Sequence, residues 1–170
     1  VSQAEFDAWL HEPGVPSTAP ATVSSRLDAV DAARKAWLES GTMASASVTK
    51  AWTTQEWVHF IEGMPPMLTP AQIKALDAAY TLTGTPNAEI AQRWYPLTIR
   101  SGYAAARPAI ADFLSQIGRR KLVMPIYRAL AQSPDGLGFA RDVFSKARPG
   151  LHPITIGSVE DALEDKPATP

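Results

Sequence analysis

Helix signals recur at a nearly constant interval along this chain and constrain its fold more than any other feature. Segments typical of helix starts lie near residues 53, 69, 87, 103, 121 and 136. Pairs of helices therefore repeat at about 34 residues, the period of two-helix solenoids. Because no segment shows the alternation of a half-buried strand, we predict an all-α fold, a right-handed α-α superhelix of the armadillo or HEAT type. A compact irregular helical bundle is the alternative, since no consensus residues repeat.

Proline and capping residues set the expected helix boundaries. Proline makes up 15 of the 170 residues and mostly separates the helical patterns. The segments Thr53-Thr54-Gln55-Glu56 and Thr69-Pro70-Ala71-Gln72 have the spacing of a capping box, and Asn87 is a third N-cap. Residues 41–49 are rich in Ser, Thr and Ala and are predicted to form a surface loop. The expected helices cover about residues 23–39, 53–63, 69–80, 87–98, 104–117, 122–131, 138–147 and 152–163, with Gly118 as a left-handed cap after the fifth.

Residues 13–20 combine four turn-forming and extended-biasing prolines and glycines without any charge, which is typical of a linker. We therefore predict a domain boundary, with residues 1–21 comprising the end of a preceding domain and a Pro-rich linker, and residues 22–170 forming the helical domain. The amphipathic piece Phe6-Asp7-Ala8-Trp9-Leu10 is either the tail of that preceding domain or a strap on this one. Since the sequence begins at Val1 without Met, we expect it to be a piece of something longer.

Composition excludes several classes of function. The net charge is −1 and the pI is near 6.3, so no electrostatic footprint for nucleic acid or an anionic membrane is expected. The absence of cysteine excludes disulfides, thiolate zinc sites and cysteine nucleophiles. There is no apolar run of about 20 residues and no signal-peptide pattern at the start of the sequence. We expect a soluble, cytoplasmic chain with no nucleic-acid or membrane partner.

The sequence predicts no catalytic residue and no metal site. None of the three histidines, His11, His59 and His152, has the i, i+4 spacing or the H-E-x-x-H pattern of a zinc peptidase. His59 is interpreted as a surface or half-buried residue and His152 as a helix-entry residue. There is no nucleophile elbow, Walker loop or dinucleotide motif. The helical spacing of the five tryptophans favours core anchors over a ligand platform. They are Trp9, Trp37, Trp52, Trp57 and Trp94.

One cluster, Gly118-Arg119-Arg120-Lys121, has two interpretations. Cations that follow a helix C-terminus complement its dipole, by about 0.3–1 kcal/mol each. Alternatively, Arg119 and Lys121 project the same way from an extended segment and capture an anion. A planar guanidinium beside a mobile ammonium is a good receptor for a carboxylate.

Several motifs together resemble the C-terminal helical domain of leukotriene A4 hydrolase and its aminopeptidase relatives. Their order and intervals agree across nearly the whole chain. The motifs are Trp9-Leu10 before Pro13-Gly14-Val15-Pro16, Asn87-Ala88-Glu89-Ile90 with Arg93-Trp94, Gly118-Arg119-Arg120-Lys121-Leu122 with Pro125-Ile126-Tyr127, and His152-Pro153-Ile154-Thr155.

The resemblance implies a zinc aminopeptidase whose catalytic domain, with H-E-x-x-H, lies upstream and would be this chain's partner. Residues 1–21 would then include the end of that catalytic domain. The chain alone would bind no zinc and be inactive, and would form one wall of the substrate cleft. Arg119 and Lys121 would bind the carboxylate of a short peptide or, in the hydrolase proper, of a fatty-acid epoxide.

Two further expectations accompany the resemblance. Arg120 is a third cation where the family pattern has an uncharged residue, which leaves open whether Arg119 or Arg120 faces the cleft. Nothing in these residues favours epoxide hydrolysis, whereas peptide cleavage is the broader family activity. The alternative function is a free-standing α-solenoid scaffold that binds proteins through a concave face.

Overall fold

The computed structural model describes residues 2–20 and 23–164. Within these ranges every regular element is a helix, so the all-α prediction is confirmed. The α-helices are α1 (Gln3–His11), α2 (Ser25–Ser40), α3 (Ala46–Thr49), α4 (Thr54–Glu62), α5 (Pro70–Tyr80), α6 (Ala88–Arg100), α7 (Arg107–Gln116), α8 (Arg120–Ala131), α9 (Gly136–Ala147) and α10 (Pro153–Leu163). Two 3-10 turns, η1 (Ala104–Ala106) and η2 (Arg148–Gly150), precede α7 and follow α9.

The capping residues recognised in the sequence begin three of these helices. The Thr53 hydroxyl accepts a hydrogen bond from the backbone N–H of Glu56, whose carboxylate accepts one from the N–H of Thr53. Thr69 and Gln72 form the same reciprocal pair at the start of α5. Asn87 caps α6 by accepting from two backbone N–H groups. Each cap satisfies donors that the first helical turn leaves without an intrahelical partner, which explains why the helices begin there.

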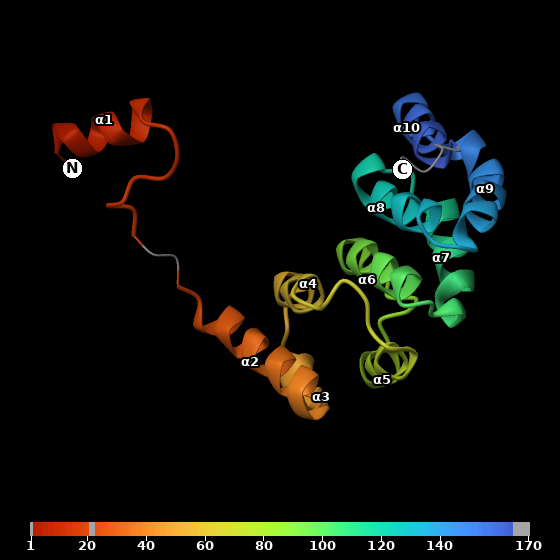
Figure 1. The fold of residues 1–170 in the computed structure, drawn as a ribbon, viewed down its shortest axis with the longest axis horizontal. Coiled ribbons are helices and arrows are strands. Elements are labelled where there is room, and N and C mark those ends of the chain that lie inside the picture. The colour runs from red at the N-terminus through yellow and green to blue at the C-terminus, as the bar shows by residue number, and fades with distance from the viewer. Residues whose placement is uncertain (1, 21–22, 165–170) are drawn as a thin grey trace.

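The even-numbered helices pack in sequence as one row, α2 on α4, α4 on α6, α6 on α8 and α8 on α10. Of the helices between them, α7 packs on α9, and α9 also contacts α8 and α10. Figure 1 shows the chain advancing stepwise from α2 to α10 along a curved array. This solenoid-like arrangement places α4, α6 and α8 side by side, and their ends carry the candidate site.

Large apolar side chains fill the space between the helices. The largest fully buried ones include Trp94, Tyr95, Tyr127, Phe60, Ile73, Leu76, Ile110 and Leu114. Trp37 is also buried, and Trp52 and Trp57 pack against the core through ring contacts with Phe60. The interpretation of tryptophans as core anchors is therefore confirmed for four of the five. It is wrong for Trp9, which is 54% exposed on α1.

Helix α1 stands apart from the rest of the chain (Figure 1). It has a complete capping box, formed by Ser2 and Glu5, but none of its residues is buried. Its large apolar side chains Phe6, Trp9 and Leu10 are each more than half exposed. The predicted domain boundary at residues 21–22 lies outside the described residues. Among the described helices, none is both long and apolar enough to cross a membrane.

The loop predicted for residues 41–49 contains a short helix, α3. Gly41 ends α2 in a left-handed conformation, with φ of 72°, which suits a residue without Cβ. Two contacts fix the segment that follows. Tyr80 donates its hydroxyl hydrogen to the carbonyl of Ala44 at 3.3 Å, and the buried Thr49 donates to the carbonyl of Ser45 at 3.3 Å. These tertiary and local bonds order a sequence whose composition alone favours a loop.

The prediction that Gly118 closes a helix in a left-handed conformation is wrong. Helix α7 ends at Gln116, and Ile117 follows in an extended conformation, with φ of −108° and ψ of 113°. Gly118 is not among the described residues with positive φ. Its carbonyl accepts a hydrogen bond from Thr155 on α10 at 3.3 Å. The segment is therefore held as an extended link between α7 and α8.

Candidate functional site

The three consecutive cations lie at the beginning of helix α8 rather than after the end of α7. Arg119 is the N-cap residue and is extended, while Arg120 and Lys121 are the first two helical residues. The interpretation of these cations as partners of a helix C-terminus is therefore wrong, because a helix N-terminus is the positive end of the dipole. The expectation of an extended segment holds only for Arg119. The start of α8 instead combines three cations with backbone N–H groups, an arrangement that favours an anion.

The three side chains go to different places. Arg120 donates from Nε to the hydroxyl of Ser158 on α10 at 2.7 Å. Lys121 donates from Nζ to both carboxylate oxygens of Glu89 on α6, at 3.0 and 3.3 Å. Arg119 is exposed, and its side chain forms no hydrogen bond or ion pair within residues 2–20 and 23–164. Arg119 is thus the cation of the cluster whose guanidinium is available to a ligand.

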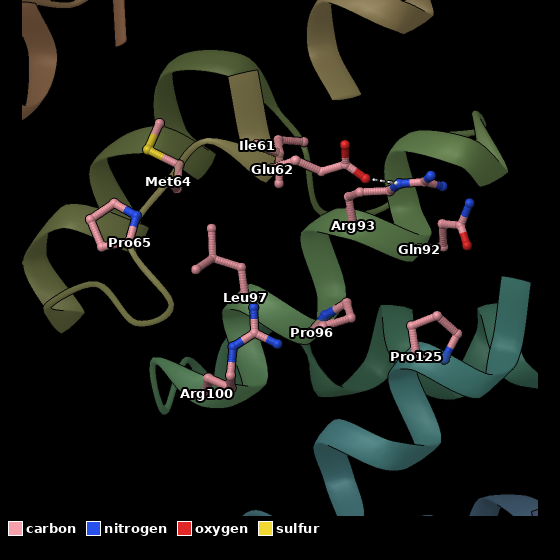
Figure 2. A pocket seen from close by; sticks show the side chains of 10 residues that line it. All are labelled: Ile61, Glu62, Met64, Pro65, Gln92, Arg93, Pro96, Leu97, Arg100 and Pro125. Carbon is pink, nitrogen blue, oxygen red and sulfur yellow. Dashed lines mark hydrogen bonds and ion pairs between the residues drawn. The ribbon is translucent and has the colours of Figure 1, made fainter. Parts of the chain in front are cut away.

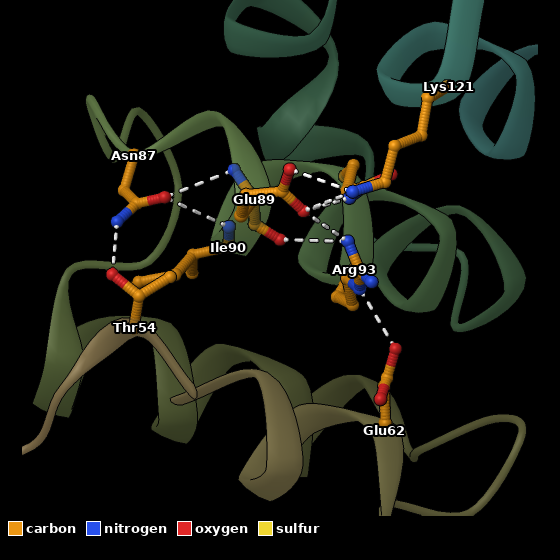
Figure 3. A network of polar contacts seen from close by, with 8 residues as sticks. Thr54, Glu62, Asn87, Glu89, Ile90, Arg93 and Lys121 are labelled. Carbon is orange, nitrogen blue, oxygen red and sulfur yellow. Dashed lines mark hydrogen bonds and ion pairs between the residues drawn. The ribbon is translucent and has the colours of Figure 1, made fainter. Parts of the chain in front are cut away.

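Glu89 is the centre of a polar network that joins α4, α6 and α8 (Figure 3). Besides Lys121, it accepts hydrogen bonds from Arg93 at 2.8 Å and from Gln92 at 2.6 Å. Arg93 in turn donates from Nε to Glu62, the last residue of α4, at 2.9 Å. The hydrogen bond from Lys121 is the main cause that lowers the pKa of Glu89 below its usual value, against a smaller opposing effect of burial.

The helix starts fix the position of this network. The side-chain oxygen of Asn87 accepts from the backbone N–H of Glu89 at 3.0 Å, so Glu89 lies in the first turn of α6. The side-chain amide of Asn87 also donates to the hydroxyl of Thr54, the first residue of α4, at 2.8 Å. One capping residue therefore ties the starts of α4 and α6 together (Figure 3).

A groove of about 370 Å³ adjoins the network and lies between α4, α6 and α8 (Figure 2). It is lined by Ile61, Glu62, Met64, Pro65, Gln92, Arg93, Pro96, Leu97, Arg100 and Pro125. Pro96 and Pro125 lie inside α6 and α8, so each of these helices lacks one backbone N–H donor where it faces the groove. Arg100 is held by the carbonyl of Pro66, to which its Nε donates at 2.6 Å. The lining combines apolar surface with the Glu62–Arg93 ion pair, so the groove suits a ligand that has both apolar and polar groups.

The histidines do not form a site. His59 is half-buried, as predicted, and its Nε2 lies 2.8 Å from a carboxylate oxygen of Asp31. His152 caps α10, where its Nδ1 accepts from the N–H of Ile154 at 3.2 Å, so its interpretation as a helix-entry residue is confirmed. In the described parts of the chain, no group of three His, Asp or Glu side chains is placed to hold a metal ion.

Reasoning from the sequence did not assign a role to Glu89, Arg93 or Glu62. The signal for the first two was available, because Glu89 and Arg93 have the i, i+4 spacing of an ion pair on one helix face. The pairing of Glu89 with Lys121 spans 32 residues and joins two helices, so no local pattern indicates it.

Comparisons with known proteins connect this chain to a family. The profile of the family described as "Leukotriene A4 hydrolase, C-terminal" matches residues 52–163. A leukotriene A-4 hydrolase homolog of Botryotinia fuckeliana is 29% identical over 97% of this chain and 26% of that protein. Leucine aminopeptidase 2 of Aspergillus fumigatus is 30% identical over 98% of this chain and 28% of that protein. The chain thus spans about a quarter of the length of these relatives.

A solved structure has the same fold. Native yeast LTA4 hydrolase superposes with a TM-score of 0.80 and 23% identity, over 94% of this chain and 29% of the yeast chain.

Proposed function

Because the chain belongs to the family defined by the C-terminal part of leukotriene A4 hydrolase, we propose that it is the C-terminal domain of a zinc aminopeptidase. In this proposal it forms one wall of the substrate cleft and supplies Arg119 and Lys121 to bind the carboxylate of a short peptide. The relatives named as hydrolase and aminopeptidase support the class of activity, and the chain corresponds to about a quarter of each of them. The remaining length of those proteins is the expected source of the catalytic groups.

The zinc ion of this proposal belongs to the upstream catalytic domain. The described residues offer no cluster that fits a metal ion. The contribution of this chain is to bind and orient the substrate. The chain by itself is accordingly proposed to be inactive toward aminoacyl anilides.

The unpaired guanidinium of Arg119 at the start of α8 is the observation that carries this proposal. The backbone N–H groups of the first helical turn and the ammonium of Lys121 belong to the same helix start. A carboxylate placed there gains charge-assisted hydrogen bonds from side chains and the favourable end of the helix dipole. A free peptide carboxylate has the right charge and shape for a guanidinium fork.

The test is substitution Arg119→Ala in the full-length protein. We expect kcat/KM for short peptides with a free carboxylate to fall by a factor of about 10 to 200, the equivalent of about 1.5–3 kcal/mol for a charge-assisted hydrogen bond. The same peptides with an amidated C-terminus have no carboxylate to lose and serve as the control. An equal loss with both kinds of peptide would mean that Arg119 has only a structural role.

The exposed α1 supports a further part of this proposal, the packing of residues 1–21 against the upstream domain. Three large apolar side chains on one short helix without a buried residue are typical of a surface that another part of a protein covers. The free-standing scaffold remains the second candidate function, and its support is the solenoid-like array itself. The scaffold predicts no effect of Arg119 on peptide hydrolysis.

A further inference from the structure

Glu89 pairs with Lys121, one of the two residues proposed to bind the substrate carboxylate. Both oxygens of its carboxylate accept hydrogen bonds from the lysine ammonium. The Lys121 side chain is 55% exposed and has a long flexible stem, so this pairing fixes an ammonium that would otherwise sample many positions (Figure 3). Glu89 is itself held in place by Arg93 and Gln92.

The network around Glu89 is electrically balanced. Two cations, Lys121 and Arg93, face two carboxylates, Glu89 and Glu62. Arg120 is turned toward α10 and bonds to a neutral hydroxyl. Among the described residues Arg119 and Arg120 both lack an acidic partner, and Arg119 also lacks any side-chain hydrogen bond. A ligand carboxylate bound by Arg119 therefore adds a negative charge beside a network whose own charges already cancel.

The short distance from Lys121 to Glu89 makes the site selective for the charge of the ligand. An anion that accepts a hydrogen bond from Lys121 lies at most about 6 Å from the Glu89 carboxylate, because each of the two bonds to the ammonium is about 3 Å long. Two like charges at that separation repel enough to weaken binding about threefold in water, and more in a partly buried site. A ligand with a second negative charge near its carboxylate meets this repulsion twice.

We propose that Glu89 is a positioning and selectivity residue, which fixes the ammonium of Lys121 and restricts the site to ligands with a single carboxylate. The preferred substrates are then short peptides whose last residue is uncharged, rather than Asp or Glu. This inference rests on the proposed function of Arg119 and Lys121. The observation behind it is that Glu89 on α6 lies beside Lys121 at the start of α8.

The test uses the full-length protein and three peptides, trialanine, its C-terminal amide and a dialanyl-glutamate. We expect the wild type to prefer trialanine over dialanyl-glutamate about threefold to tenfold in kcat/KM. Glu89→Gln keeps the shape and removes the charge, so this preference should fall about threefold or more, through KM and with kcat nearly constant. Hydrolysis of the amide should not change.

Two more variants complete the design. Glu89→Asp keeps the charge on a shorter stem and should retain the preference for trialanine, with a raised KM for both free acids. Glu160→Gln is the matched control. Glu160 on α10 also forms a surface ion pair, with Arg148 at 3.0 Å, but it has no contact with α6 in this pair. It should leave all three peptides unaffected.

The outcomes separate this inference from the function on which it rests. An unchanged preference in Glu89→Gln, or an equal effect on the amide, overturns the role of Glu89. If Glu89→Gln does not fold, loss of the preference in Glu89→Asp overturns it instead. The proposed function fails separately, if the wild type and Arg119→Ala treat free-acid and amide peptides alike.

Discussion

Arg26 on α2 and Glu56 on α4 form a two-bond ion pair, with 3.0 Å from Nε to Oε1 and 2.8 Å from Nη2 to Oε2. Glu56 also completes the capping box at Thr53, so one carboxylate both begins α4 and attaches it to α2. The hydrogen bonds from Arg26, followed by those from Thr53, lower the pKa of Glu56 from 4.5 to about 2. The first two helices of the even-numbered row are therefore joined by a group that titrates in acid.

This pair predicts how stability depends on pH. A carboxyl group whose pKa is lower in the folded state stabilises the fold above its unfolded pKa, and this contribution is lost as the pH falls from 4.5 toward about 2. We expect Glu56→Gln to be less stable than the wild type at neutral pH and to lose less stability over that acidic interval. Urea unfolding at several pH values measures both effects. If the free energy of unfolding changed with pH in the same way for both proteins, Glu56 would not be the cause of this pH dependence.

The hydroxyl of Tyr127 predicts a substitution that stabilises the domain. Tyr127 is fully buried on α8, and its hydroxyl oxygen has no hydrogen-bond partner among the described residues. Burial raises the pKa of Tyr127 to about 12. Because an unsatisfied buried polar group costs free energy, Tyr127→Phe should raise the free energy of unfolding by about 1 kcal/mol.

Tyr95 offers the matched control for that experiment. It is equally buried, but its hydroxyl accepts a hydrogen bond from the backbone N–H of Gly84 at 3.3 Å. Tyr95→Phe should therefore lower the free energy of unfolding by about 1 kcal/mol. Denaturant unfolding of both variants gives the comparison. A similar loss in the two variants would show that the Tyr127 hydroxyl has a partner after all.

Helix α1 predicts an interaction between this chain and the proposed upstream domain. If Phe6, Trp9 and Leu10 pack on that domain, the separately expressed parts should associate, and Trp9→Ala should weaken the complex about tenfold or more, as for a buried aromatic anchor. Isothermal titration of one part with the other measures this. Leu38→Ala, which shortens an exposed side chain on α2, is the control and should have no effect. Two folded parts that do not associate at high micromolar concentration would contradict the predicted interface.

The sequence was informative where structure is determined locally. Thr53, Thr69 and Asn87 mark helix starts because capping involves residues only two or three positions apart. The prediction for Gly118 failed because its conformation is not determined locally. Its carbonyl contacts Thr155, 37 residues away. The same limit applies to the site. Three adjacent cations were visible in the sequence, but their separate directions depend on α6 and α10 and required the fold.

Comparison of Arg120 with Lys121 decides which cations of the cluster bind the substrate. Arg120 is held by Ser158 on α10, whereas Lys121 faces the network on α6. In the full-length protein, Lys121→Ala should lower kcat/KM for free-acid peptides, by less than Arg119→Ala, because an ammonium on a flexible stem is a less directional partner. Arg120→Ala should change kcat/KM less than about twofold, since its guanidinium is held by Ser158 on α10. A loss confined to free-acid peptides in Arg120→Ala, and absent in Arg119→Ala, would show that the anion site is real but that Arg120 is its arginine.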